Sequence, residues 1–361
     1  MIGPTLGRYI GGRFLKTVLV VFTTMFGLIY LIDFVEMLRR ASDVPGATTA
    51  FVAFLTLLRI PAIVEQILPF AVLFGAIAAF LNLTRKLELV VARAAGVSVW
   101  QFLAPPVLIA AALGVFFVTT FNPISAMLKQ RADKIETRLF GRPGRTDGEA
   151  ALWIRQRSID GQAIIRAERS SDGGTVLSNV TAFVFEADGA LMERVDAARA
   201  RLKSGFWDIE DARVTAPTTE PRSTATYLLA TNLTPEQVTQ SFVSPDSVSF
   251  WALPNLVERT AQAGLDATSY RMRYQTLMAR PLMLVAMVLI AATFSLRFFR
   301  FGGVAKMVSG GVAAGFMLYV ATKLVADLGG AGLLAAPVAA WSPAIVGCML
   351  GALALLYQED G

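Results

Sequence analysis

Residues 67–83 read ILPFAVLFGAIAAFLNL and contain no charged side chain. They belong to a longer apolar run, Phe51 to Leu81, and about 20 such residues suffice for a helix to cross the hydrocarbon core of a bilayer. The whole chain has 361 residues, of which 55% are hydrophobic and 17% charged, and its mean hydropathy is +0.55. A soluble domain is about 45–50% apolar and about 25% charged. The chain is therefore predicted to be an integral membrane protein.

The same criterion predicts six spans, arranged as three and three. They are Phe14–Met37, Phe51–Leu81, Val99–Phe121, Pro281–Phe299, Val304–Leu328 and Ala335–Tyr357. Hydrophobicity falls after Asn122-Pro123 and stays low until about Arg280, so a polar insert separates the two groups. The first span follows a basic start, as a signal peptide would. It exceeds the apolar core of a signal, about 7–15 residues, and lacks a convincing cleavage site, so we expect a retained helix.

Lys and Arg near the helix ends predict the orientation, because these residues accumulate in cytoplasmic loops. Nine lie on one side: Arg8, Arg13, Lys16, Arg85, Lys86, Arg93, Arg297, Arg300 and Lys306. Two, Arg39 and Arg40, lie on the other side. Both termini are therefore expected in the cytoplasm and the insert in the periplasm. The net charge of +6 fits such loops and anionic lipids better than nucleic acid.

The insert has the pattern of a β domain. Short runs with partial alternation are separated by turn signals such as Asp160-Gly161 and Asp188-Gly189. The seven expected strands are 151–156, 162–168, 178–186, 190–196, 199–203, 207–214 and 224–229. A sandwich, a jellyroll or an open barrel would fit them. Helices are expected to lead in at Ile124–Leu139 and out at Leu253–Ala279.

The sequence lacks the residues that several kinds of catalytic and binding site require. It has no His, and its single Cys, Cys348, lies in an apolar run, which excludes His-based acid–base chemistry, most zinc sites and an intrachain disulfide. The motif GxxxxGK[ST] is missing, so no phosphate loop of that kind is present. Lys203 and Ser204 are the one candidate Ser–Lys catalytic pair considered. They are neighbours on a strand, so their side chains would point to opposite faces of the sheet. A membrane-anchored periplasmic enzyme is therefore the weaker alternative.

Four segments together are similar to a known family. They are RYI at residues 8–10, DFVEMLRR at 33–40, LPFA at 68–71 and ELVVARAAGVS at 88–98. The chain resembles the LptF/LptG permeases, the paired membrane subunits of the lipopolysaccharide extractor, and its details are more similar to the LptG branch. The resemblance implies six transmembrane helices (3+3) with an inserted periplasmic all-β jellyroll-like domain. The expected divisions are 1–123, 124–279 and 280–361.

The resemblance also implies partners and a substrate. The expected partners are a sister LptF-like permease, a cytoplasmic LptB-like ATPase dimer, a single-span LptC-like bridge protein and a periplasmic LptA-like relay. ATP and Mg are expected on the ATPase, and no cofactor is expected in this chain. Lipopolysaccharide would enter between the first and fifth helices of the two permeases and pass up into the jellyroll. A permease of the same fold that moves another lipid or a lipoprotein is the other alternative.

The cytoplasmic loop 84–96 is expected to form a helix of its own. Leu87, Val90, Val91 and Ala94 would make an apolar face, Glu88 would lie near the N-terminus, where the helix dipole favours a carboxylate, and Gly96 would end the helix in a left-handed cap. An interfacial helix with solvated charges fits these residues equally well. The resemblance makes it the helix that docks on the ATPase, with Glu88 as charged anchor. The residues assigned to this coupling are Glu88, Leu89, Arg93, Ala94 and Gly96.

The candidate lipid-binding residues are Arg39, Arg40, Lys323, Phe183 and Ile165. The two arginines could simply anchor the first helix at the interface, and Asp33 and Glu36 nearby could neutralise them. The resemblance instead places them at the cavity mouth, facing phosphates that suit guanidinium forks. Lys323 could snorkel, pair with Asp327 four residues away, or face a phosphate. The expected inward residues of the insert, either sandwich core or slot lining, are Trp153, Ile154, Ile164, Ile165, Phe183 and Phe185.

One acidic residue lies within an apolar span. Glu65 is flanked by Pro61 and Pro69 in the second span. A charged group at the centre of a bilayer costs roughly 2.5–3.5 kcal/mol on insertion scales, so it needs partners. We expect Glu65 to lie in a hydrated or protein-lined pocket, with a structural role favoured over a substrate contact.

Overall fold

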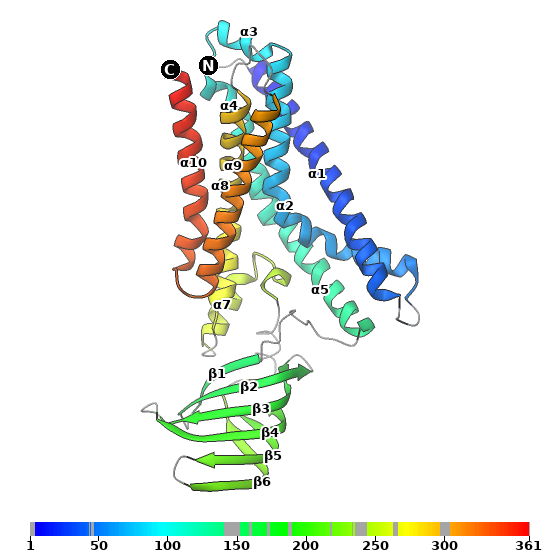
Figure 1. Cartoon of the computed structure of the whole chain (residues 1–361), viewed down its shortest axis with the longest axis vertical. Helices are drawn as coiled ribbons and strands as arrows, with labels where there is room; N and C mark the ends of the chain where they lie inside the picture. The colour runs from blue at the N-terminus through cyan, green and yellow to red at the C-terminus, as the bar shows by residue number, and fades with distance from the viewer. Residues whose placement is uncertain are drawn as a thin grey trace. The chain divides into compact units, whose positions relative to one another are not determined.

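The computed structural model describes residues 4–42, 44, 47–140, 152–158, 161–171, 174–186, 190–216, 219–232, 234, 244–262, 266–296 and 304–360. The chain divides into two compact units. The helical unit comprises residues 1–132, 249–251 and 268–361, and the β-sheet unit comprises residues 133–248 and 252–267. Figure 1 shows the elements of both.

Long helices make up the helical unit. They are α1 (Pro4–Ala41), α2 (Thr49–Arg85), the short α3 (Glu88–Ala94), α4 (Val99–Phe116), a π-helix (Phe117–Phe121), α5 (Asn122–Phe140), α8 (Thr268–Ser295), α9 (Val304–Gly330) and α10 (Ala336–Asp360). Within the described residues, six stretches are long and apolar enough to cross a membrane, which confirms the six predicted spans. The start of α1 and the end of α10 lie at the same end of this unit as α3 (Figure 1).

The membrane helices begin at local sequence signals. The Thr48 side chain accepts a hydrogen bond from the Phe51 amide at the start of α2, and Ser98 does the same for Gln101 at the start of α4. Each cap satisfies one of the amides that a first helical turn leaves without a partner. The two capping residues therefore fix where the second and third spans begin.

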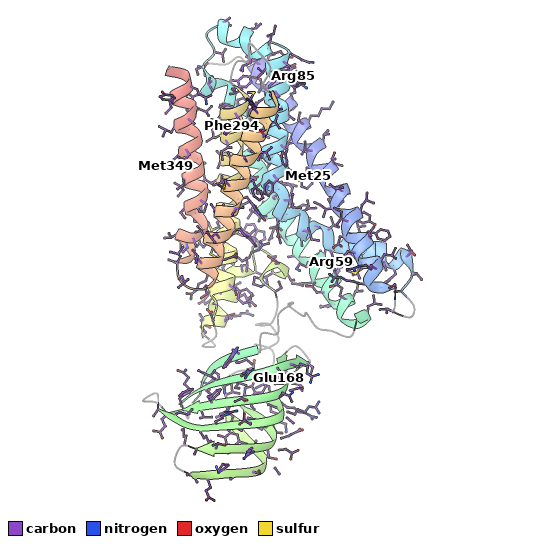
Figure 2. All side chains as sticks on the ribbon, in the orientation of Figure 1. Met25, Arg59, Arg85, Glu168, Phe294 and Met349 are labelled. Carbon is purple, nitrogen blue, oxygen red and sulfur yellow. The ribbon has the colours of Figure 1, made fainter. Side chains whose placement is uncertain are left out.

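Burial differs sharply among the spans. Of the most apolar stretch of each helix, 61% is buried in α2 and 67% in α8, against 6% in α1 and 11% in α9. Glycines permit close contact in the core: a methyl group on Gly114 of α4 would lie 2.4 Å from Cα of Pro281 in α8. A methyl group on Gly310 of α9 would lie 2.9 Å from the ring of Phe294, which Figure 2 labels on α8. The helical unit thus has a core of α2, α4 and α8 and two sparsely covered helices.

Two predicted helix ends are wrong. The third span does not stop at Asn122-Pro123, because the chain continues through the π-helix into α5. Proline is tolerated here because the carbonyl that it leaves free, that of Thr119, accepts a hydrogen bond from Trp251 instead. The predicted helix Leu253–Ala279 is two helices, α7 (Leu253–Gln262) and α8, with residues 266–267 non-helical between them.

In the part of the β-sheet unit that the structure describes, six strands form one antiparallel sheet in the order β1 to β6. They are β1 (Leu152–Ser158), β2 (Gly161–Ser171), β3 (Val176–Phe185), β4 (Leu191–Lys203), β5 (Phe206–Ala216) and β6 (Thr219–Ala230). An inserted antiparallel all-β domain is confirmed. Six strands replace the seven expected, because 190–196 and 199–203 belong to one continuous strand, β4.

One face of this sheet forms the core of the unit. A row of paired residues crosses five strands on that face and is buried throughout: Ile154, Ile165, Ala182, Val195 and Val214. Gln156 of β1 ties the first strand to the last two. Its amide oxygen accepts from Trp207 Nε1 at 3.1 Å and from Thr231 Oγ1 at 2.6 Å, and its Nε2 donates to the carbonyl of Ala230 at 3.1 Å. The sheet is therefore curved enough to bring β1 to the β5–β6 side.

Candidate functional site

The predicted coupling helix exists but is shorter than the loop 84–96. It is α3, which starts at Glu88 directly after Leu87, a residue with a positive φ of 60°. Gly96 follows the helix with φ 83°, which confirms the left-handed cap. Residues with positive φ, a conformation that L-residues rarely adopt, therefore lie on both sides of this short helix and fix its direction.

Glu88 is held by the start of α1. Arg13 Nη1 lies 2.9 Å from Glu88 Oε1, and the Tyr9 hydroxyl donates to the same oxygen at 3.1 Å. Arg13 also donates to the Tyr9 hydroxyl, lies over the Tyr9 ring at 5.7 Å, and reaches Asn82 Oδ1 at 3.2 Å. Sequence reasoning counted Arg13 only as a loop charge and missed this contact. The available signal was weak, since it consisted of one basic and one acidic residue far apart in the sequence.

Apolar side chains in and directly before α3 are exposed. Leu89 is buried against the helical core, whereas Leu87 and Val91 are 61% and 67% exposed, and Ala94 is also exposed. The side chains of Val90 and Arg93 lie outside the described residues, so the assigned role of Arg93 stays a prediction. An α3 that is anchored by Leu89 and by Glu88 thus presents Leu87 and Val91 outward.

Both arginines at the other end of α1 share one carboxylate. Glu36 lies 2.9 Å from Arg39 and 2.9 Å from Arg40, at the i+3 and i+4 positions of the helix. The neutralisation considered for Glu36 is therefore present, and the cluster of three side chains keeps a net charge of +1. Asp33 is directed elsewhere: it faces Arg59 of α2, labelled in Figure 2, at 3.9 Å. The guanidiniums remain mostly exposed, with 77% of the Arg39 side chain accessible.

Lys323 and Asp327 lie on the open face of α9. Both are exposed, and among the described residues no ion pair joins them, so pairing along the helix is not what this structure contains. Large apolar side chains surround them on the same helix: Phe316, Met317, Val320, Leu324 and Leu328 are all exposed. This surface combines one ammonium group and one carboxylate with an apolar stripe.

The two candidate residues of the insert lie on opposite faces of the sheet. Ile165 is 1% exposed and pairs with the buried Ala182, whereas Phe183 pairs with Ile164 on the other face and has the Arg194 guanidinium 5.8 Å from its ring. The expectation that both point inward is wrong, because Ile165 pairs with Ala182 and the next residue of β3, Phe183, points to the opposite face. For the same reason Ile154 is buried while its neighbour Trp153 is 59% exposed.

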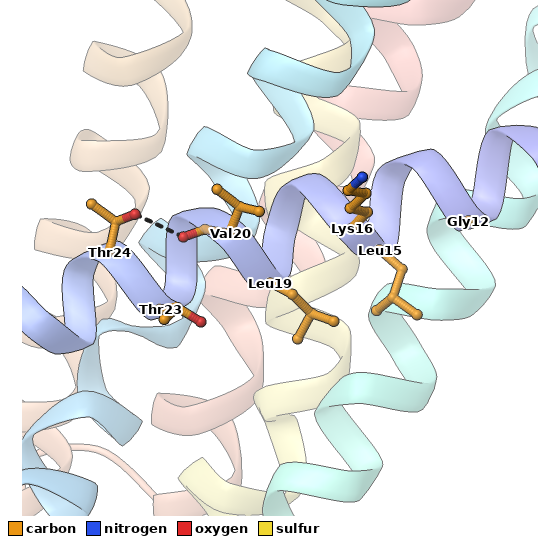
Figure 3. Close-up of a pocket in the computed structure, with 7 residues that line it drawn as sticks. All are labelled: Gly12, Leu15, Lys16, Leu19, Val20, Thr23 and Thr24. Carbon is orange, nitrogen blue, oxygen red and sulfur yellow. Dashed lines mark hydrogen bonds between the residues drawn. The ribbon is translucent and has the colours of Figure 1, made fainter.

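A shallow groove of about 550 Å³ runs along the open side of α1. Its lining residues all come from that helix: Gly12, Leu15, Lys16, Leu19, Val20, Thr23 and Thr24 (Figure 3). At its basic end a second groove, of about 470 Å³, is lined by Tyr9, Gly12, Arg13, Lys16 and Lys86. Between residues 12 and 24 the open side of α1 thus combines apolar side chains with two threonines, and it is basic beside α3.

The acidic residue within the second span has three partners. Glu65 is 1% exposed, and its carboxylate accepts from Arg280 at 2.8 Å, from Arg273 at 3.1 Å and from Asn122 Nδ2 at 3.1 Å. The protein-lined pocket expected for this residue is therefore confirmed. Its donors come from α8 and from the first residue of α5, which sequence reasoning did not foresee. A buried carboxylate is tolerable only with such charged and hydrogen-bonding partners.

Comparison with known proteins adds a family relationship. The family model described as "Lipopolysaccharide export system permease LptF/LptG" matches residues 8–358. The chain is 26% identical over 337 residues to the Lipopolysaccharide export system permease protein LptG of Escherichia coli K12, covering 90% of each chain. It is 25% identical over 338 residues to the protein of the same name from Haemophilus influenzae, covering 89% of each chain. The similarity therefore includes both the helical and the β-sheet unit.

Proposed function

Because the chain belongs to the LptF/LptG family of lipopolysaccharide export permeases, we propose that it is the LptG-type half of a transporter that extracts lipopolysaccharide from the inner membrane. The chain is a multi-pass inner-membrane permease of the lipopolysaccharide export system. The comparisons give no support to a permease for another lipid or to a membrane-anchored enzyme. Three parts of the chain would contribute to export: the exposed spans, α3 and the β-sheet unit.

The observation that carries the proposal is the exposure of α1 and α9. On a soluble protein, an exposed apolar surface of this size would mark a binding site. In a membrane protein, such a surface faces lipid or another helix. Among the six candidate spans within the described residues, these two helices have the least buried apolar stretches, 6% and 11%. They are the first and fifth spans, so a sister LptF-like permease opposite them would close a wide apolar cavity. Lipopolysaccharide acyl chains fit such a cavity because most of the exposed side chains of these two helices are apolar.

The head of the lipid would be held at the outer rim. Arg39 and Arg40 keep a net charge of +1 after Glu36 is counted, and their guanidiniums are exposed. Lys323 on α9 offers a third cation. Guanidinium forks match phosphate oxygens in geometry, which supports the assignment of these residues to the phosphorylated sugar.

Energy would be supplied from outside this chain. We assign α3 to docking on a cytoplasmic LptB-like ATPase dimer, which would bind the ATP and Mg. The exposed Leu87 and Val91, together with Glu88, offer an apolar surface with one charged edge, as a helix-in-groove contact requires. The start of α1, the end of α10 and α3 lie at one end of the helical unit (Figure 1), and the count of basic residues favours the cytoplasm for that end.

The β-sheet unit would receive the lipid in the periplasm. Ile165 lies on the buried face, which would line a slot if the sheet opened, whereas Phe183 would contact lipid only on the opposite face. An LptC-like bridge protein and an LptA-like relay are the proposed next carriers. They would take the lipid toward the outer membrane.

Purification of the tagged chain from membranes tests this assembly. We expect a second six-span permease and a cytoplasmic ATPase to copurify in defined stoichiometry, together with lipopolysaccharide. Purification of the chain alone, from cells in which it is functional, would contradict the proposed partners. Partners without lipopolysaccharide would contradict the proposed cavity.

A further inference from the structure

We propose that Glu65 and Asn122 are positioning residues for transport. Together with Arg280, they hold two chain segments against helices α2 and α8. One segment is the start of α5, which leads to the β-sheet unit, and the other is 249–251, which leads back from it. Movement of these helices would then be passed to both segments. The inference rests on the permease function of the chain and requires no particular ATPase contact. It concerns only contacts within the helical unit.

The cluster forms where prolines interrupt the helices. Pro69 has no N–H to offer the carbonyl of Glu65 one turn earlier, and Arg280 Nη1 donates to that carbonyl at 3.1 Å. The same nitrogen binds the Glu65 carboxylate at 2.8 Å. One guanidinium therefore satisfies both the side chain and the freed backbone oxygen of a single residue.

The second interruption is solved in the same way. Pro123 has no N–H for the carbonyl of Thr119, which lies in the π-helix, and the indole Nε1 of Trp251 donates to that carbonyl at 3.1 Å. Trp251 belongs to the segment 249–251, through which the chain returns from the β-sheet unit. The π-helix, which leads into α5, is thus hydrogen-bonded to segment 249–251 at the carbonyl that Pro123 leaves free.

Asn122 joins these two interruptions. Its Nδ2 donates to the Glu65 carboxylate at 3.1 Å, and its Oδ1 accepts from the Phe250 amide at 2.8 Å. The Phe250 ring stacks on Tyr274 of α8 at 5.3 Å. Asn122 is 1% exposed, so both contacts are protected from water. One buried amide side chain therefore connects α2, the start of α5 and the return segment.

The location of the cluster gives it a mechanical consequence. Helices bend most readily at prolines and at π-turns. Here Pro69 in α2, the π-helix after α4 and Pro281 in α8 are tied together through a carboxylate that cannot be left without partners. A bend in α2 must therefore displace α8 and both segments with it.

The test compares Asn122→Ala with Gln275→Ala. Gln275 of α8 accepts a hydrogen bond from Trp341 of α10 at 3.1 Å, so the control also removes a partly buried contact between helices, one that does not include segment 249–251. Both variants replace the native copy in cells that depend on it. The measurements are the amount of inserted chain, its thermal stability in detergent, and lipopolysaccharide delivered to the surface per inserted chain.

We expect Asn122→Ala to lower delivery per inserted chain at least fivefold, while insertion and ATP hydrolysis by the purified complex stay within twofold of wild type. Gln275→Ala should keep delivery within twofold at a similar thermal stability. Unchanged delivery by Asn122→Ala would overturn the inference. So would equal losses of delivery in the two variants, since these would indicate stability alone.

A pair of further variants examines the hydrogen bond itself. Glu65→Gln should lower delivery of lipopolysaccharide. Glu65→Gln combined with Asn122→Asp should restore at least half of the loss. In the double variant the carboxylate is on residue 122, where it accepts from the amide of residue 65 and still accepts from the Phe250 amide. Failure of the double variant to exceed the single one would contradict the role of this bond. A wild-type complex that delivers lipid but hydrolyses no ATP would instead contradict the proposed ATPase, and delivery per inserted chain would still decide the inference.

Discussion

Arg13 of α1 and Glu88 of α3 are 75 residues apart in sequence, and their side chains lie 2.9 Å apart. The contact holds the proposed coupling helix against the first span before any partner arrives. Glu88 is 31% exposed in this pair, so one side of its carboxylate stays accessible. α3 would therefore already be oriented when the ATPase docks, and a movement of α3 would be passed to α1 through this contact.

The first prediction separates the internal role of Glu88 from its docking role. Glu88→Arg should abolish transport and weaken ATPase copurification, since a charge-assisted contact at an interface contributes on the order of 1.5–3 kcal/mol. Arg13→Glu combined with Glu88→Arg recreates the internal pair with reversed charges. We expect this swap to restore thermal stability but not ATPase docking.

Two results would contradict that prediction. Wild-type yields of ATPase with Glu88→Arg would remove the docking role altogether. Full recovery of docking by the swapped pair would show that Glu88 acts only through Arg13.

The second prediction concerns the lipid head. Arg39→Glu with Arg40→Glu changes the charge of this cluster from +1 to −3 and should reduce the lipopolysaccharide that copurifies. Glu36→Gln should act in the opposite direction, because it releases both guanidiniums from their shared carboxylate. Bound lipopolysaccharide, measured by mass spectrometry at equal amounts of inserted chain, checks both changes. Undiminished binding by the double variant would return the arginines to interface anchoring.

The third prediction concerns the closure of the β-sheet unit. Gln156→Leu keeps the volume of the side chain but leaves Trp207 Nε1, Thr231 Oγ1 and the Ala230 carbonyl without their partner. Each buried polar group left unsatisfied costs about 1–3 kcal/mol. Hydrogen–deuterium exchange of β1 should therefore rise strongly. Thr231→Val removes one of the three bonds with little change in side-chain volume and should have a smaller effect, whereas equal protection in both variants would contradict the tie.

The sequence predicted the spans and the β class correctly because both depend on local patterns. Apolar length defines a membrane helix, and turn dipeptides with alternation define antiparallel strands. The third span was predicted to end at Phe121 and a helix to begin at Ile124, whereas the helical stretch is continuous for a non-local reason: Trp251, far along the chain, donates to the carbonyl that Pro123 leaves free. Alternation alone separates Ile164 from Ile165 and could have been predicted, whereas the side on which Phe183 lies also depends on the pairing of β2 with β3.

The contacts of the site were harder to foresee. The sequence identified Glu65 as a residue in need of partners and Glu88 as a charged anchor for the ATPase, but Arg280 and Arg13 are brought to these two residues only by helix packing. Arg39 and Arg40 were named with Glu36 as a possible neutralising group, since i+3 and i+4 spacing on a helix is local information. Local pairs were thus predictable, and pairs between helices were not.

Lipid contact along α1 and α9 tests the proposed transport cavity most directly. A photocrosslinking residue would replace Leu31 on α1, Met317 on α9 or, as a control, Leu353 on α10, which are 59%, 70% and 64% exposed. We predict that lipopolysaccharide is captured at Leu31 and Met317 in the membranes of growing cells, and that Leu353 captures ordinary phospholipid instead. Equal capture of lipopolysaccharide at all three positions, or none at Leu31 and Met317, would contradict a transport cavity lined by these two helices.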